Sequence, residues 1–77
     1  MPTLKISVKL YAVLQLERFQ EKEFNVAEGV TVAEVVADLD LPSEHVDILL
    51  VNGVHVTADH VLAEGDVLSV LPMVDGG

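Results

Sequence analysis

The stretch Ile48-Leu49-Leu50-Val51-Asn52-Gly53-Val54-His55-Val56 contains the strongest local fold signal in the chain. Its four leading apolar residues have the length of a short buried strand. Asn52-Gly53 is the strongest short-range signal for a β-hairpin, because both central turn positions need a positive φ. Val54-His55-Val56 then returns as the partner strand. We therefore expect an antiparallel hairpin in the second half of the chain.

An earlier pair of strands is predicted by alternation. Apolar side chains recur at every second position near the amino terminus, at Leu4, Ile6, Val8 and Leu10. A period of two indicates a half-buried strand. Residues 11–18 break the alternation and indicate a loop, and residues 22–26 resume it with Phe24 and Val26 on one face. Glu28-Gly29 ends this first hairpin.

The last strand is predicted after a second glycine turn. Glu64-Gly65-Asp66 has turn composition, and the apolar run 67–71 follows it directly. Pro72 ends the run, because proline has no N–H to donate to a sheet ladder.

A helix is predicted between the two hairpins by its spacing. Its apolar residues fall at positions i, i+3, i+4 and i+7, which is one helical face: Val32, Val35, Val36 and Leu39. Thr31 followed by Glu34 matches a capping box, in which the threonine caps the helix and the glutamate reaches back. We expect the helix to span residues 31–39 and to be stopped by Pro42.

These elements predict an α+β roll. The order is strand, strand, helix, strand, strand, strand, so the first and last strands can pair in parallel at the centre of a sheet of four to five strands. One main helix would pack across one face. We expect a single domain over residues 1–72 and a flexible tail over residues 73–77.

Composition narrows the classes of function. The 77 residues carry a net charge of −9, with 51% hydrophobic residues and no cysteine. Four basic residues cannot neutralise a phosphate backbone, and an anionic membrane is disfavoured likewise, so we expect no nucleic acid and no membrane as partner. A basic protein partner, simple solubility and a salt-adapted host each explain the acidity. With no apolar run of membrane-spanning length and no signal peptide, we expect a cytoplasmic protein.

The side chains present no clear candidate for a metal, catalytic or phosphate-binding site. His45, His55 and His60 have no metal-ligand spacing, the serines have no base in pattern, and no glycine loop could cradle a phosphate. We therefore expect no bound metal and no bound cofactor.

The end of the chain is the remaining candidate. Gly76-Gly77 follows the last strand after a short spacer, and residues 73–77 could extend roughly 17 Å. Glycines can thread a channel too narrow for other residues. A free carboxylate is a poor electrophile, so ATP has to convert Gly77 to an acyl-adenylate before a sulfur nucleophile displaces AMP. Because the chain has no cysteine, both the adenylating activity and the sulfur must come from partners.

The segment Val51-Asn52-Gly53 and the segment from Leu62 to Gly77 resemble the sulfur-carrier family. That family includes the molybdopterin-synthase small subunit and the thiamine-biosynthesis sulfur carrier. The resemblance implies a ubiquitin-like β-grasp fold and a C-terminal glycine activated by a ubiquitin-activating-like adenylating enzyme that uses ATP. It also implies a thiocarboxylate, delivered to a sulfur-accepting synthase subunit. Such a protein is a cosubstrate and not an enzyme.

Several positions depart from the family pattern. Leu71 replaces an aromatic residue before Pro72, Met73 replaces a second proline, and Gln15 lies about where an arginine is common. The resemblance assigns Leu71, Pro72 and Gln15 to the partner interface. It assigns the activated group to Gly77 and the tail to Met73, Val74, Asp75 and Gly76.

Two other functions stay open at this point. A ubiquitin-like modifier would use the same adenylate and end on a lysine of another protein. A plain β-grasp binding module would leave the tail unused, as a frayed terminus.

Overall fold

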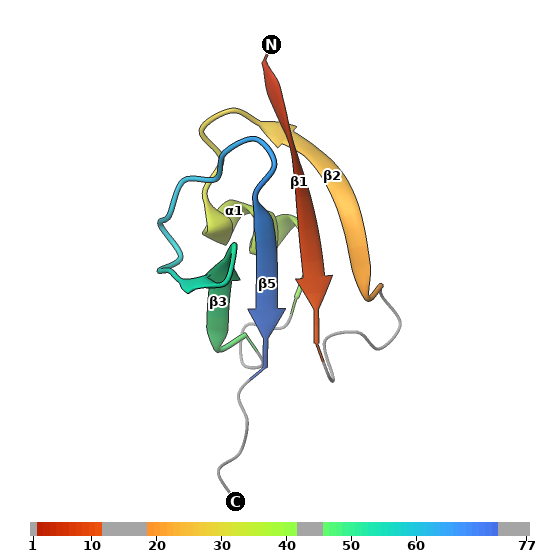
Figure 1. Cartoon of the computed structure of the whole chain (residues 1–77), viewed down its shortest axis with the longest axis vertical. Coiled ribbons are helices and arrows are strands. Elements are labelled where there is room, and N and C mark those ends of the chain that lie inside the picture. Colours follow the sequence, from red (N-terminus) through yellow and green to blue (C-terminus); the bar gives the residue numbers. More distant parts are fainter. Residues whose placement is uncertain (1, 12–18, 42–45, 73–77) are drawn as a thin grey trace, which may run out of the picture.

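The computed structural model describes residues 2–11, 19–41 and 46–72. These residues form the elements that the sequence predicts, in the predicted order: β1 (Thr3–Leu10), β2 (Glu21–Ala27), α1 (Val32–Asp38), β3 (Ile48–Val51), β4 (Val54–His55) and β5 (Val67–Leu71). The predicted α+β roll is confirmed, with all five strands in one sheet and α1 packed across one face (Figure 1).

The sheet has the order β2-β1-β5-β3-β4. Strands β1 and β5 run parallel, with Ser7 aligned to Val67 and Leu10 aligned to Val70. The other neighbouring pairs, β1–β2, β3–β5 and β3–β4, are antiparallel. The expected parallel pairing of the first and last strands is therefore confirmed. Strand β5 is the middle strand of the sheet, so it is hydrogen-bonded to β1 on one side and to β3 on the other.

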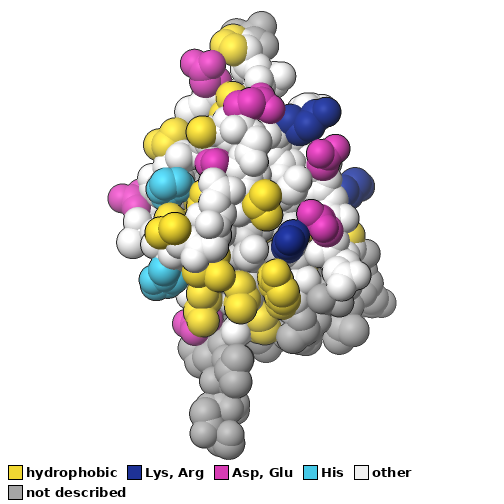
Figure 2. All heavy atoms as spheres, viewed as in Figure 1, with side chains coloured by type: hydrophobic (Ala, Val, Ile, Leu, Met, Phe, Trp, Pro, Cys, Tyr) yellow, Lys and Arg dark blue, Asp and Glu magenta, His cyan; other side chains and the backbone are white. Residues whose placement is uncertain are grey.

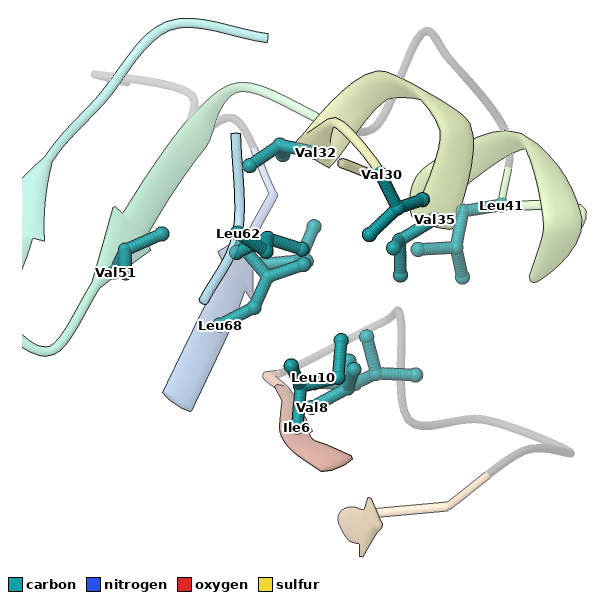
Figure 3. Packing of buried hydrophobic residues seen from close by; sticks show 11 residues of the cluster. Ile6, Val8, Leu10, Val30, Val32, Val35, Leu41, Val51, Leu62 and Leu68 are labelled. Atoms are coloured by element: carbon teal, nitrogen blue, oxygen red, sulfur yellow. The ribbon is translucent and has the colours of Figure 1, made fainter. Parts of the chain in front are cut away.

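The core lies between α1 and the sheet (Figure 3). Each of β1 and β5 contributes alternate side chains, and Val8, Leu68 and Val70 have no exposed surface. Val32 and Val35 of α1 meet them from the other side. Alternation in the strands and helical spacing in α1 thus direct both sets of apolar residues to one layer.

The amino end of α1 has the predicted capping box. Thr31 is the N-cap, its hydroxyl accepts a hydrogen bond from the Glu34 N–H over 3.3 Å, and Glu34 Oε1 accepts from the Thr31 N–H over 3.4 Å. Two N–H groups that the helix itself leaves unpaired are thereby satisfied. Helix α1 has seven residues, and within the described ranges no helix is long and apolar enough to cross a membrane.

The carboxyl end of α1 differs from the prediction. The helix ends at Asp38 with Leu39 as its C-cap, before Pro42, which lies outside the described residues. Asp40 has a φ of 56°, so the chain turns there in the left-handed region. The Asp40 N–H donates to Ala37 O and the Leu41 N–H to Val36 O, which is the hydrogen-bond pattern of a Schellman motif. Expecting Pro42 as the stop was wrong, because an aspartate in place of the usual glycine closes the helix first.

The second hairpin has the predicted turn. Asn52 and Gly53 have φ values of 53° and 83°, as a type I′ turn requires. Strand β4 contains only Val54 and His55, although the Val56 N–H still donates to Leu49 O over 3.0 Å. The expectation that β3 is buried throughout was wrong, since only Val51 is buried and its other residues are half-buried.

Candidate functional site

The carboxyl end of β5 is where the described chain leaves the sheet. Leu71 is aligned with Ile48, and the Leu71 carbonyl oxygen accepts a hydrogen bond from the Asp47 N–H over 3.1 Å. Pro72 follows, is buried and has no N–H to extend the ladder. The backbone is therefore hydrogen-bonded in the sheet up to Leu71, and Pro72 separates Leu71 from the segment 73–77.

Three half-buried apolar side chains lie on the face of the sheet away from α1, at this same end. Ile48 is aligned with Leu71, and Leu50 is aligned with Ser69 of β5. Because the neighbouring Val70 is fully buried toward α1, alternation directs Leu71 to the opposite face. We refer to Ile48, Leu50 and Leu71 as the apolar patch.

Hydrophobic side chains gather at this end of the sheet face that Figure 2 presents. The only helix among the described elements covers the other face of the sheet. Tyr11, which follows Leu10 at the end of β1, is also 39% exposed. Partly exposed apolar side chains that lie together in this way can mark a protein–protein contact.

Charged side chains border the patch on the β1 side. Lys9 is aligned with Ser69 of β5 and with Glu21 of β2. Lys9 is half-buried and Glu21 is exposed. The patch thus has charged side chains along its β1 side, as the polar rim of a binding surface does.

A polar network occupies the other end of β5, where the strand begins. The Asn52 amide donates to Asp66 Oδ1 over 2.9 Å, and Asn52 Oδ1 accepts from the Val67 N–H over 3.0 Å. Asp66 Oδ2 accepts from the Ala63 N–H over 2.8 Å. These hydrogen bonds therefore connect two turns, the one in Val51-Asn52-Gly53 and the one in Glu64-Gly65-Asp66. Their role is structural, since β5 separates them from the segment that follows Leu71.

The described residues contain no cluster of metal-ligating side chains. Among them no group of three or more His, Asp or Glu is placed to hold a metal ion. His55 lies on β4 next to Leu50, whereas the carbonyl of His60 accepts a hydrogen bond from the Val32 N–H near the start of α1. The two histidines therefore belong to separate parts of the described fold.

The residues that the sequence assigned to the site divide into two groups. Leu71 and Pro72 lie within the described residues, where Leu71 belongs to the apolar patch and Pro72 is buried. The remaining ones lie outside the described residues: Gln15, Met73, Val74, Asp75, Gly76 and Gly77. Sequence reasoning missed Ile48 and Leu50 as site residues, because it treated β3 as buried on both faces.

Comparison with protein families identifies one match. The sequence matches the ThiS family over residues 8–77, which covers β1 from Val8 onward, all later elements and the Gly76-Gly77 end. A comparison with curated proteins finds no match.

Solved structures from Pyrococcus furiosus and Haloferax volcanii have the same fold. A putative molybdopterin converting factor, subunit 1, from Pyrococcus furiosus is 29% identical with a TM-score of 0.74, over 92% of this chain and 99% of that one. The Haloferax volcanii HVO 2177 protein is 22% identical with a TM-score of 0.83, over 97% and 88%. Small archaeal modifier protein 1 from H. volcanii is 20% identical with a TM-score of 0.76, over 92% and 99%. The fold is a ubiquitin-like β-grasp.

Proposed function

The chain belongs to the ThiS family, and on that premise we propose that it is a sulfur-carrier protein whose working group is the carboxylate of Gly77. The main support for the proposal is the family match through the Gly76-Gly77 end, which follows, after a short spacer, a strand that is hydrogen-bonded in the sheet up to Leu71. The protein is a cosubstrate, and its partners supply the catalysis.

The chemistry has two steps. A carboxylate oxygen of Gly77 attacks the α-phosphorus of ATP, which forms the acyl-adenylate and releases pyrophosphate. A hydrosulfide-level donor then attacks the acyl carbon, AMP leaves with the bonding electron pair, and the donor's proton passes to solvent. The product is a thiocarboxylate. Both steps take place in a ubiquitin-activating-like adenylating enzyme, because this chain has no cysteine to carry the sulfur.

The apolar patch supports this proposal by providing a docking surface at the base of the tail. Leu71 belongs to the patch and lies two positions before the first residue of segment 73–77. A partner that binds Ile48, Leu50 and Leu71 would therefore hold the tail at a fixed starting point. Fixing one end of a short segment raises the effective concentration of its other end near the partner's active site.

The sulfur acceptor in this proposal is a synthase subunit of the molybdopterin or thiamine type. The similarity to the putative molybdopterin converting factor, subunit 1, from Pyrococcus furiosus favours the first. Thiocarboxylated protein offered to each synthase in turn distinguishes them, since only the true acceptor regenerates the carboxylate form.

Intact-mass spectrometry tests the carrier function. The full chain is incubated with the adenylating enzyme, ATP and sulfide, and the expected result is the mass increase that replaces one oxygen by sulfur, located at Gly77 by fragmentation. A variant that ends at Gly76 is the matched control and stays unchanged. Absence of the increase in the full chain, with the enzyme active on a known carrier, would contradict the proposal.

A ubiquitin-like modifier is the second candidate. The fold similarity to small archaeal modifier protein 1 and the shared glycine end favour it. The two functions share the adenylate and differ in the final nucleophile, which would be a lysine amine. Purification of tagged chain under denaturing conditions separates them, because a modifier remains linked to a ladder of larger proteins.

A further inference from the structure

A second apolar surface lies beside α1, on the other side of β3 from the apolar patch. It is a hollow of about 360 Å³. Its lining includes three residues of α1, one residue just after it, one of β3 and one of the loop after β4: Ala33, Val36, Ala37, Leu41, Leu49 and Ala58. Leu49 and Leu50 are neighbours in β3 and point to opposite faces, so the hollow and the patch lie back to back.

The hollow has a small-residue rim and a larger apolar floor. Ala33, Ala37 and Ala58 are exposed, whereas Val36 and Leu49 are half-buried. The Ala33 N–H donates to Ala58 O over 2.8 Å, which fixes the loop against the first turn of α1. Methyl groups at the rim leave room for a larger side chain from outside to contact Val36 and Leu49.

Exposed acidic residues adjoin the lining of this hollow in the sequence. Glu34 follows Ala33, Asp59 follows Ala58, and Asp47 follows Val46, which also lines the hollow. The described lysines lie elsewhere, with Lys5 and Lys9 on β1 and Lys22 on β2, and β5 separates those strands from β3. The potential around the hollow is therefore negative, whereas the cations of the described chain belong to the other half of the sheet.

We propose that this hollow is a docking site for a basic segment of a partner protein, which inserts one apolar side chain between flanking Lys or Arg residues. The apolar lining selects the inserted side chain, and the adjoining carboxylates select the flanking charge. The proposal does not rest on sulfur chemistry. Because the hollow and the apolar patch lie on opposite faces, a partner bound here leaves the patch accessible to the adenylating enzyme.

Nuclear magnetic resonance titration tests the site. The probe is a helical peptide that presents leucines on one face with lysines on both flanks, added to isotope-labelled full chain. We expect amide shift changes centred on Ala33, Ala37, Leu49 and Ala58, and weaker binding as salt is added. An otherwise identical peptide with glutamates in place of the lysines should bind far more weakly.

A pair of matched variants sharpens the test. Ala37→Lys places a long, positively charged chain at the mouth of the hollow, where it blocks insertion and repels the flanking lysines, and it should raise the Kd for the basic peptide by about tenfold or more. Ala27→Lys makes the same change at an exposed alanine of β2, at the far edge of the sheet, and should leave the Kd unchanged. If Ala37→Lys does not fold, Ala58→Lys serves in its place.

Four results would overturn the proposal. Shift changes confined to Ile48, Leu50 and Leu71 would place the peptide on the apolar patch. Equal affinity for the acidic peptide would remove the charge argument. Shifts that depend on chain concentration without peptide would make a second copy the occupant. Contacts between residues 42–45 and Ala37, with no response to the peptide, would show that the chain fills its own hollow.

Discussion

The side chain of Asn52 donates a hydrogen bond from Nδ2 to Asp66 Oδ1 over 2.9 Å, and this contact joins residues fourteen positions apart. Asn52 also pairs with Val67 twice, through its Oδ1 to the Val67 N–H and through its own N–H to the Val67 carbonyl. The β3–β4 turn is thereby fixed to the start of β5. The Asp66 carbonyl in turn accepts from the Ser7 N–H over 3.0 Å, which brings β1 into the same junction.

Asn52→Ala should lower the free energy of unfolding by about 2 kcal/mol. The variant loses two side-chain hydrogen bonds, each contributing about 0.5–1.5 kcal/mol, and places alanine at a positive φ that asparagine tolerates better. Urea denaturation followed by circular dichroism measures the change. A loss of this size is a large part of the total stability of a domain of this length.

A double-mutant cycle with Asp66→Ala isolates the contact itself. The loss in the double variant should fall short of the sum of the two single losses by about 0.5–1.5 kcal/mol. Asn25→Ala is the matched control, because Asn25 is exposed on β2 and has no side-chain hydrogen bond within the described residues. Strict additivity of Asn52→Ala and Asp66→Ala would show that the 2.9 Å contact contributes nothing.

Thr31→Ala should destabilise the fold by about 1 kcal/mol, because the Glu34 N–H loses its hydroxyl acceptor at the N-cap. Thr3→Ala, at an exposed position at the start of β1, should change the unfolding midpoint little. Thermal or urea unfolding of the two variants, measured in parallel, gives the difference between their losses of stability. Equal effects would mean that the loss reflects threonine-to-alanine replacement in general and not the cap.

Asp40→Val should cost more than 1 kcal/mol, since a β-branched residue is strongly disfavoured at a φ of 56°. Asp40→Asn should be tolerated, because asparagine adopts the left-handed region readily. The comparison is made by denaturant unfolding at one pH. Equal stability of the valine and asparagine variants would contradict the Schellman ending of α1.

Local chemistry explains which elements the sequence could predict. The capping box at Thr31 and the turn at Asn52-Gly53 depend on residues a few positions apart, so the sequence contains the whole signal. The end of the helix is harder to predict from the sequence. Pro42 is the expected stop signal, whereas the residue at which the chain turns is Asp40. Aspartate is less common than glycine at that position and gives a weaker pattern.

Whether the sequence predicts the apolar patch depends on how many layers of secondary structure the fold has. The apolar run of β3 is equally consistent with a strand buried on both faces. Counting the predicted elements resolves this, because a single helix can cover only one face of the sheet. Ile48 and Leu50, on the uncovered face, are therefore not fully buried in the isolated chain. That count was available from the sequence and would have added both residues to Leu71 as interface candidates.

Leu50→Glu should lower kcat/KM of the adenylating enzyme for this chain by about tenfold or more, which corresponds to about 1.4 kcal/mol or more of lost binding to the transition state. The physical reason is that a charge is placed in the centre of the apolar patch, where partner binding would desolvate it. Val54→Glu is the matched control, since Val54 is 64% exposed in the hairpin at the other end of β3. Circular dichroism first establishes that both variants are folded. Unchanged kcat/KM for folded Leu50→Glu would show that the patch is not part of the interface. It would not contradict the proposed chemistry at Gly77, because intact-mass spectrometry tests that step independently.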